Sequence, residues 1–163
     1  MRKVSEKVQL EAAEKLVSSL NKMDGVESSV DVRTNGTQNR PIVNASVSPE
    51  NWGMVAKQLK EKHLVDHCSM ITGIHWPESS DKKWEVIYHF LRTGIRDPVI
   101  EGGLVIPNIV DFSKVKGKDV PLEIQISIKI GDTRTPSVPS VQNLWVGADW
   151  NEKETWDLSL IHI

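Results

Sequence analysis

The sequence has little of what marks several common protein classes. Its 163 residues include one cysteine, Cys68, which excludes an internal disulfide and a cysteine metal cluster and is typical of a reducing cytoplasm. No apolar run approaches the roughly 20 residues that a membrane-spanning helix needs. The amphipathic N-terminal pattern predicts a helix and not a signal peptide. The net charge of −2 argues against nucleic acid as a partner, because phosphate binding favours a basic surplus.

Motifs of common catalytic sites are missing as well. The sequence has no dinucleotide-binding glycine pattern, no phosphate-binding loop, no nucleophile elbow and no HExxH. We therefore expect no catalytic, cofactor-binding or metal-binding residue in this chain. One alternative stays open: an independent soluble α+β enzyme or ligand-binding domain that uses the region of His67, Cys68, His75 and His89. Two of its histidines, His75 and His89, would then face each other across a hairpin, although catalytic zinc normally takes three protein ligands.

The pattern of apolar residues predicts an α+β fold. Residues 5–22 and 48–63 have apolar positions at helical spacing, and each segment begins with a serine that suits an N-cap. Short β patterns cover residues 26–32, 42–47, 64–75, 84–92 and 122–130. Strict alternation along 122–130 predicts a sheet with one buried and one wet face. The order helix, two strands, helix, three strands is that of a two-layer sandwich with helices on one face of a mainly antiparallel sheet.

We expect one domain with two parts. Residues 1–134 form the α+β core, with a loop excursion at 94–121 that is rich in glycine and proline. Residues 135–163 form a C-terminal helical docking segment of the same domain. Within it, Asp149 and Glu152 make a near capping box that would start a helix. In the core, the Asn-Gly pair at 35–36 signals a hairpin, in a loop that we expect to be longer than the two-residue type.

What the sequence has in excess is tryptophan. It contains six tryptophans against two phenylalanines and one tyrosine, and three of the six lie between residues 145 and 156. Four carboxylates are interleaved with these three: Asp149, Glu152, Glu154 and Asp157. The stretch is either a solvated helix whose tryptophans pack on the chain's own sheet or a surface that binds another protein. Tryptophan is enriched at interface hot spots, and acids beside it would select a basic partner. Lys153 and Asp157 are expected to pair at i, i+4.

This C-terminal stretch resembles the signature of a known family. Residues 139–141 (PSV), Trp145, 148–150 (A-x-W) and Glu152-Lys153-Glu154 with Asp157 (E-R-E-x-x-D) are similar to the 30-kDa subunit of respiratory complex I, an NADH dehydrogenase. The resemblance covers about residues 50–163. Lys153 replaces the family's arginine and loses its planar fork, and the excursion is longer than the family's turn. These departures suit related subunits of archaeal deazaflavin-linked dehydrogenases or of energy-converting hydrogenases.

The resemblance implies a role, partners and a location. A family member is a non-catalytic structural subunit of a membrane-associated NADH–quinone or deazaflavin-type dehydrogenase, or of an energy-converting hydrogenase. It has no cofactor, and the iron–sulfur, flavin and quinone sites lie on partner subunits. We expect a large (49-kDa-like or hydrogenase-like) catalytic subunit and an iron–sulfur subunit as partners, in the cytoplasm, peripheral at the inner face of the cell membrane. The predicted partner-binding residues are Trp145, Trp150, Glu152, Lys153, Glu154 and Asp157, with the two tryptophans as anchors.

Overall fold

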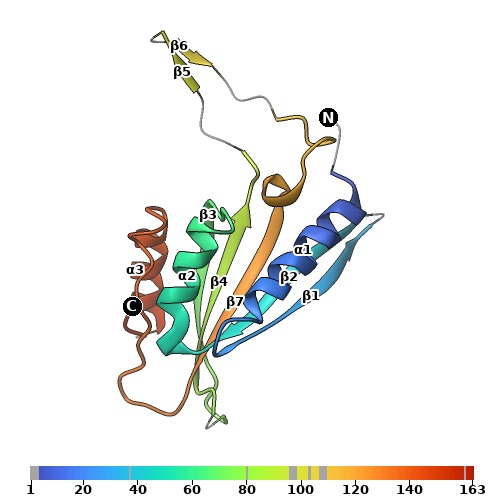
Figure 1. Ribbon diagram of the computed structural model, residues 1–163. Coiled ribbons are helices and arrows are strands. Elements are labelled where there is room, and N and C mark those ends of the chain that lie inside the picture. The colour runs from blue at the N-terminus through green and yellow to red at the C-terminus, as the bar shows by residue number, and fades with distance from the viewer. Residues whose placement is uncertain are drawn as a thin grey trace.

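A five-stranded sheet forms the centre of the fold (Figure 1). The computed structural model describes residues 4–36, 38–79, 81–95, 99–102, 104–106, 110–159 and 161–163. The sheet has the order β1-β2-β7-β4-β3, and its strands are β1 (Val26–Asn35), β2 (Gln38–Val47), β3 (His67–His75), β4 (Trp84–Arg92) and β7 (Leu122–Ile130). Neighbouring strands are antiparallel except β2 and β7, which are parallel. The predicted α+β class and element order are therefore confirmed.

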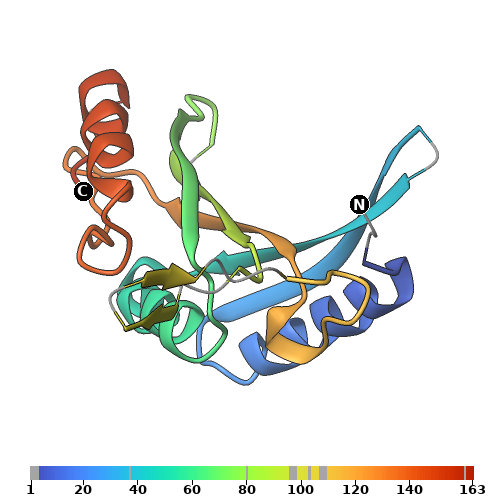
Figure 2. The same ribbon diagram turned by 90° about the horizontal axis from the view of Figure 1, so that it is seen from above.

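Two helices, α1 (Glu6–Leu20) and α2 (Trp52–Glu61), cover one face of this sheet, as the view from above shows (Figure 2). A short 3-10 turn, η1 (Pro49–Asn51), precedes α2. The buried residues of both helices recur at helical spacing: Ala12, Ala13, Leu16 and Leu20 in α1, and Trp52, Val55, Ala56 and Leu59 in α2. On β7 the buried positions alternate with half-buried or exposed ones, which confirms the predicted wet face. In the described parts of the chain, no helix is both long enough and apolar enough to cross a membrane.

The C-terminal helix, α3 (Ala148–Ser159), lies along β3 at one edge of the sheet (Figures 1 and 2). The Thr155 hydroxyl donates a hydrogen bond to the carbonyl oxygen of Ile71 on β3 at 3.1 Å. Ser159 comes so close to Gly73 that a Cβ at Gly73 would lie 2.5 Å from the serine hydroxyl oxygen. The absence of a side chain at residue 73 thus lets the helix approach the strand, and α3 covers this edge.

Two connections differ from the sequence prediction. β1 and β2 remain paired as far as Asn35 and Gln38, so two residues join them and the prediction of a longer loop is wrong. Gly36 has a φ of 61° in this turn, a conformation that glycine adopts without strain. β3 begins at His67 and not at residue 64, because Leu64 has a φ of 56° and so cannot continue a strand.

The predicted excursion at 94–121 contains short elements of its own. A small hairpin of β5 (Val99–Glu101) and β6 (Leu104–Ile106) stands clear of the five-stranded sheet (Figure 1). A 3-10 turn, η2 (Gly117–Asp119), follows just before β7. The segment thus leaves the sheet after β4 and returns to it at β7.

Candidate docking surface on the C-terminal helix

The inner face of α3 is fixed to the rest of the chain by Glu152. Its carboxylate accepts hydrogen bonds from the Ser140 hydroxyl at 2.6 Å and from the Val141 N–H at 2.7 Å. Glu152 is 6% exposed, and its bond to Val141 is buried while that to Ser140 is part-buried. The predicted capping box with Asp149 is wrong, because α3 begins at Ala148 and Glu152 instead binds the start of the preceding turn. This contact fixes α3 to the segment that leads into it.

Trp145, a predicted anchor for a partner, lies in the chain's own core. It is 3% exposed, and its indole N–H donates a hydrogen bond to the Val65 carbonyl at 3.0 Å. Its ring packs on Phe90 with the ring centroids 4.5 Å apart, and the Lys60 ammonium lies 5.6 Å from its centroid. The structure therefore gives Trp145 and Glu152, two of the six predicted partner-binding residues, internal contacts.

The outer face of α3 presents the other four predicted residues. They lie three or four positions apart, which places them on one side of the helix, and all are exposed: Trp150, Lys153, Glu154 and Asp157. The Trp150 side chain is 78% exposed. Val146 just before the helix and Leu158 near its end are 87% and 80% exposed. We call these six residues the outer face of α3. Val146, Trp150 and Leu158 are thus three large apolar side chains of this segment that stand exposed.

The charges on this face do not pair as the sequence suggested. The Lys153 ammonium lies 2.7 Å from a carboxylate oxygen of Asp149 and not beside Asp157 as predicted. It also lies 5.6 Å from the centroid of the Trp150 ring. Since Asp149 offsets the charge of Lys153, Glu154 and Asp157 leave the outer face net negative.

The residues of the alternative site, His67, Cys68, His75 and His89, do not come together. His75 stacks on Trp84 with ring centroids 4.1 Å apart, and Nε2 of His89 lies 3.1 Å from Oε1 of Gln125. The expectation that these histidines face each other is wrong, because their cross-strand neighbours are Trp84 and Met70. Cys68 is 4% exposed, and burial raises the pKa of its thiol to about 12. Among the residues that the structure describes, no cluster of three or more histidine, cysteine or acidic side chains could hold a metal ion.

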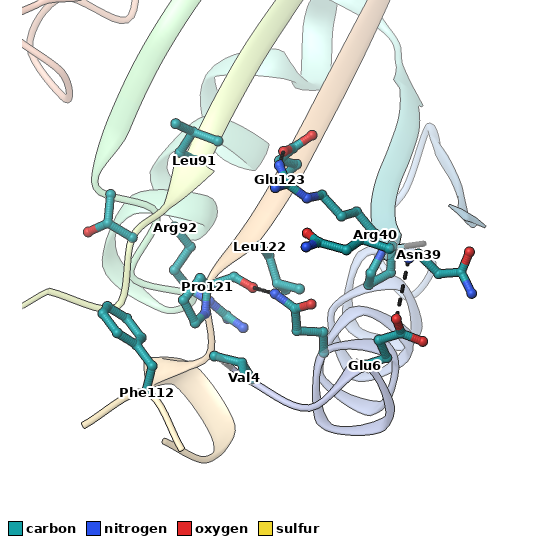
Figure 3. Close-up of a pocket in the computed structure, with 14 residues that line it drawn as sticks. Val4, Glu6, Asn39, Arg40, Leu91, Arg92, Phe112, Pro121, Leu122 and Glu123 are labelled. Atoms are coloured by element: carbon teal, nitrogen blue, oxygen red, sulfur yellow. Dashed lines mark hydrogen bonds and ion pairs between the residues drawn. The ribbon is translucent and has the colours of Figure 1, made fainter. Parts of the chain in front are cut away.

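A cavity of about 660 Å³ opens at the end of the sheet beside the start of α1 (Figure 3). Its apolar lining includes Val4, Pro41, Leu91, Phe112, Pro121 and Leu122. Polar groups in the lining bind one another: Arg40 lies 3.9 Å from Glu123, and a carboxylate oxygen of Glu6 accepts from the Asn39 N–H at 3.3 Å. The lining contains no histidine or cysteine among the described residues. The pocket is therefore amphipathic, with an apolar lining and the charged side chains of Glu6, Arg40, Arg92 and Glu123.

Two buried polar side chains near this end of the sheet were not predicted. Arg92 is 4% exposed, and its guanidinium donates to the carbonyl oxygens of Val120 at 2.8 Å and of His63 and Gly117 at 3.4 Å. Desolvation lowers the pKa of His63 to about 4, and nearby positive charges add to the effect. The alternation of β4 contained the signal for Arg92, since it places residue 92 on the same face as the buried Phe90.

Comparison with known proteins agrees with this fold and with the C-terminal signature. The family described as "Respiratory-chain NADH dehydrogenase, 30 Kd subunit" matches residues 45–163. The chain belongs to this family. The match includes α2, β3, β4, β7 and α3, and begins near the end of β2. The resemblance of the C-terminal residues is therefore confirmed at the level of the family.

Individual relatives show how far the similarity extends. A chloroplastic NAD(P)H-quinone oxidoreductase subunit of Liriodendron tulipifera is 33% identical over 109 residues, which cover 60% of this chain and 68% of the relative. The same protein of Psilotum nudum is 28% identical over 88 residues, with 53% and 54% covered. An NADH-quinone oxidoreductase subunit of Rhizobium etli is 28% identical over 96 residues, with 59% and 32% covered. The chain thus spans about half of the Psilotum relative and a third of the Rhizobium one.

A solved structure extends the likeness over nearly the whole chain. A trypsin-resistant fragment of Nqo5 has a TM-score of 0.55 and 15% identity, and the match covers 95% of both chains. At this identity the match shows a shared fold. It includes α1 and β1, which precede the region that the family match covers.

Proposed function

We propose that this chain is a structural subunit of a complex I-like redox complex and that it docks on the large catalytic subunit through the outer face of α3. The observation that carries the proposal is the difference between the two sides of this helix. Glu152 and Thr155 fix the inner side to Val141 and Ile71, whereas Trp150 on the outer side is 78% exposed. A tryptophan on an immobilised helix loses little conformational entropy on binding, which favours its use as an anchor.

The composition of the outer face indicates the surface that it would bind. Trp150, Val146 and Leu158 supply apolar area, and Glu154 and Asp157 supply negative charge. The complementary surface is an apolar groove with lysine or arginine residues at its rim. We therefore expect such a groove on the large subunit, with an iron–sulfur subunit as a second neighbour.

We further propose that the reaction of the complex takes place on partner subunits. Burial of Cys68 and the contacts of His75 and His89 with Trp84 and Gln125 give these side chains packing roles in this chain, which supports the proposal. Iron–sulfur, flavin and quinone sites would then lie on the partners, at the cytoplasmic face of the cell membrane. An NADH- or deazaflavin-linked dehydrogenase is the leading complex. Lys153 in place of the family's arginine keeps an energy-converting hydrogenase as the second candidate.

Co-purification tests the docking proposal. The affinity-tagged chain is co-expressed with the large subunit of the same organism's complex, and the large subunit recovered with it is measured. We expect Trp150→Ala to lower this recovery about tenfold or more, since an interface tryptophan is typically a hot spot. A double variant, Glu154→Lys with Asp157→Lys, should also lower the recovery of the large subunit relative to wild type, because it reverses the charge of the outer face of α3. Circular dichroism should show the wild-type fold for both, because these side chains are exposed.

A matched control removes an exposed apolar side chain from another helix. Met54 on α2 is 49% exposed and lies outside α3, so Met54→Ala should leave the recovery unchanged. Undiminished recovery of the large subunit with both α3 variants would show that the outer face of α3 is not the docking surface.

A further inference from the structure

We propose that the free edge of β1, residues 30–34, pairs with the same edge of a second copy of this chain, in antiparallel register about Val32. The two edges of the sheet differ. α3 lies along β3, whereas in the described residues no strand pairs with the outer side of β1, which forms the opposite border of the sheet (Figure 1). An open edge strand presents unpaired N–H and C=O groups that can template another strand.

The side chain of Asn21 shows which backbone groups of β1 point outward. Its amide oxygen accepts from the Ser28 N–H at 2.7 Å, and its amide nitrogen donates to the Ser28 carbonyl at 3.1 Å. The backbone groups of Ser28 therefore face away from β2. Because these directions alternate along a strand, the groups of every second residue that follows also face outward: Val30, Val32 and Thr34. Pro41 lies opposite Val32 and has no N–H, which agrees with this assignment.

Asn21 also limits the stretch that another strand can use. Since its amide occupies both backbone groups of Ser28, pairing is blocked at that position, and the outward groups beyond it on β1 are those of Val30, Val32 and Thr34. A two-fold axis at Val32 places Val32 opposite its own copy and Val30 opposite Thr34. These pairs would exchange about six backbone hydrogen bonds.

The charges of this stretch are self-complementary about the same axis. Asp31 falls opposite Arg33 of the second copy, and Arg33 falls opposite the copy's Asp31, so two pairs of opposite charge form on one face of the joined sheet. Cross-strand pairs of opposite charge stabilise a sheet, and like charges destabilise it. Within its own hairpin Arg33 lies opposite Arg40, a like-charge pair. The second copy therefore supplies the acidic neighbour that the hairpin does not place opposite Arg33.

Exposed apolar side chains lie along this edge as well. Val32 is 53% exposed. Val17 and Asn21 of the α1 segment both contact Ser28, so the side of α1 on which they lie faces β1. Leu10 shares that side by helical spacing and is 37% exposed. Pairing of two copies would shield these side chains. The stretch is short, so we expect a weak dimer with a Kd on the order of 100 µM.

Sedimentation equilibrium of the full chain tests the proposal over concentrations from about 10 µM to about 1 mM, chosen to bracket that Kd. The average mass should rise from 18.3 kDa toward twice that value. Asp31→Arg and Arg33→Asp should each raise the Kd about tenfold or more, because each places like charges opposite one another twice. The two changes combined should restore the Kd to within about threefold, because the opposite-charge pairs form again in reverse. Glu27→Arg makes the same charge change on the same strand outside the stretch and should leave the Kd unchanged.

A backbone variant tests the edge itself. Val32→Pro removes an N–H that is not used between β1 and β2, so circular dichroism should show a folded monomer, whereas Val32→Thr should still dimerise. A wild-type monomer at every concentration overturns the proposal. So does a dimer that survives both Val32→Pro and Asp31→Arg. If the single charge variants weaken the dimer and the combined variant does not restore it, the self-complementary register is wrong. If the wild type is monomeric and Val32→Pro lowers the co-purification of the large subunit, the edge of β1 pairs with a strand of that other chain and not with a second copy.

Discussion

The carboxylate of Glu152 accepts a hydrogen bond from the Ser140 hydroxyl at 2.6 Å, across the turn that leads into α3. Because the same carboxylate also accepts from the Val141 N–H, it satisfies a backbone group that would otherwise be buried without a partner. Glu154, two positions further along the helix, faces outward and is exposed. The two glutamates of one short signature therefore have different tasks in this chain, one in folding and one at the surface.

Glu152→Gln should destabilise the fold while Glu154→Gln should not. The glutamine amide keeps the size of the side chain but is neutral and has one acceptor oxygen, so the Val141 N–H and the Ser140 hydroxyl lose the carboxylate to which both donate. We expect a loss of about 1–3 kcal/mol in the free energy of unfolding for Glu152→Gln. For Glu154→Gln we expect a change within about 0.5 kcal/mol. Urea denaturation of the two variants measures both values, and equal stabilities would contradict the internal role of Glu152.

The tryptophans of the C-terminal segment should separate in the same way. Trp145→Phe keeps an aromatic ring beside Phe90 but leaves the Val65 carbonyl without its donor and opens a small void. We expect a loss of about 1–3 kcal/mol in unfolding free energy. Trp150→Phe changes an exposed side chain and should leave stability within about 0.5 kcal/mol. A Trp150→Phe variant as unstable as Trp145→Phe would show that the outer face of α3 is packed and not free.

The fold could be predicted from sequence because its main patterns are local. The alternation along 122–130 alone marks β7 as a strand with one wet face, and the serine and proline at 48–49 mark the start of the second helical region. Such signals depend on neighbours in the chain, which the sequence contains in full. The α+β class and the order of elements followed from them.

The direction of each C-terminal side chain depends on distant parts of the chain, and so the sequence left it open. Trp145 and Trp150 lie in the same aromatic and acidic stretch. Trp145 turns inward because Val65 and Phe90, far away in sequence, form its pocket beside the edge of β3. Glu152 turns inward because the lead-in segment folds back over α3 and offers it two donors. The spacing of residues along one helix does not predict such contacts with distant segments.

Cys68 should resist modification in the folded protein. Burial raises the pKa of its thiol from 9.0 to about 12, so the reactive thiolate is about a thousandfold rarer at pH 8 than for an unperturbed thiol. Ellman's reagent should therefore react at least about a hundredfold more slowly with the native chain than with the chain in urea. The control is a Met70→Cys, Cys68→Ala variant, which moves the thiol to an exposed position of the same strand. Met70 is 49% exposed, so this variant should react rapidly when folded. Equal rates for the two folded proteins would contradict the packing role of Cys68.

His63 should make the fold sensitive to acid in a defined window. Desolvation lowers its pKa from 6.5 to about 4 in the folded state, while its ring nitrogen Nε2 lies 3.2 Å from the Ser19 hydroxyl oxygen. Between pH 6.5 and 4 the unfolded chain therefore binds the proton more readily than the folded chain. Stability falls as the pH falls through this window, by about 3 kcal/mol in total, whereas this group changes it little above the window.

Substitution of His63 isolates this contribution from that of the carboxylates. His63→Asn keeps a polar group near Ser19 but does not titrate, so the difference in unfolding free energy between about pH 7 and about pH 4 should shrink by about 3 kcal/mol relative to wild type. His67→Asn removes an exposed histidine four positions away and should leave the pH dependence of the wild type unchanged. Urea denaturation at several pH values measures each slope. If both variants keep the wild-type dependence of unfolding free energy on pH, His63 contributes nothing to it. The acid sensitivity then comes from other groups.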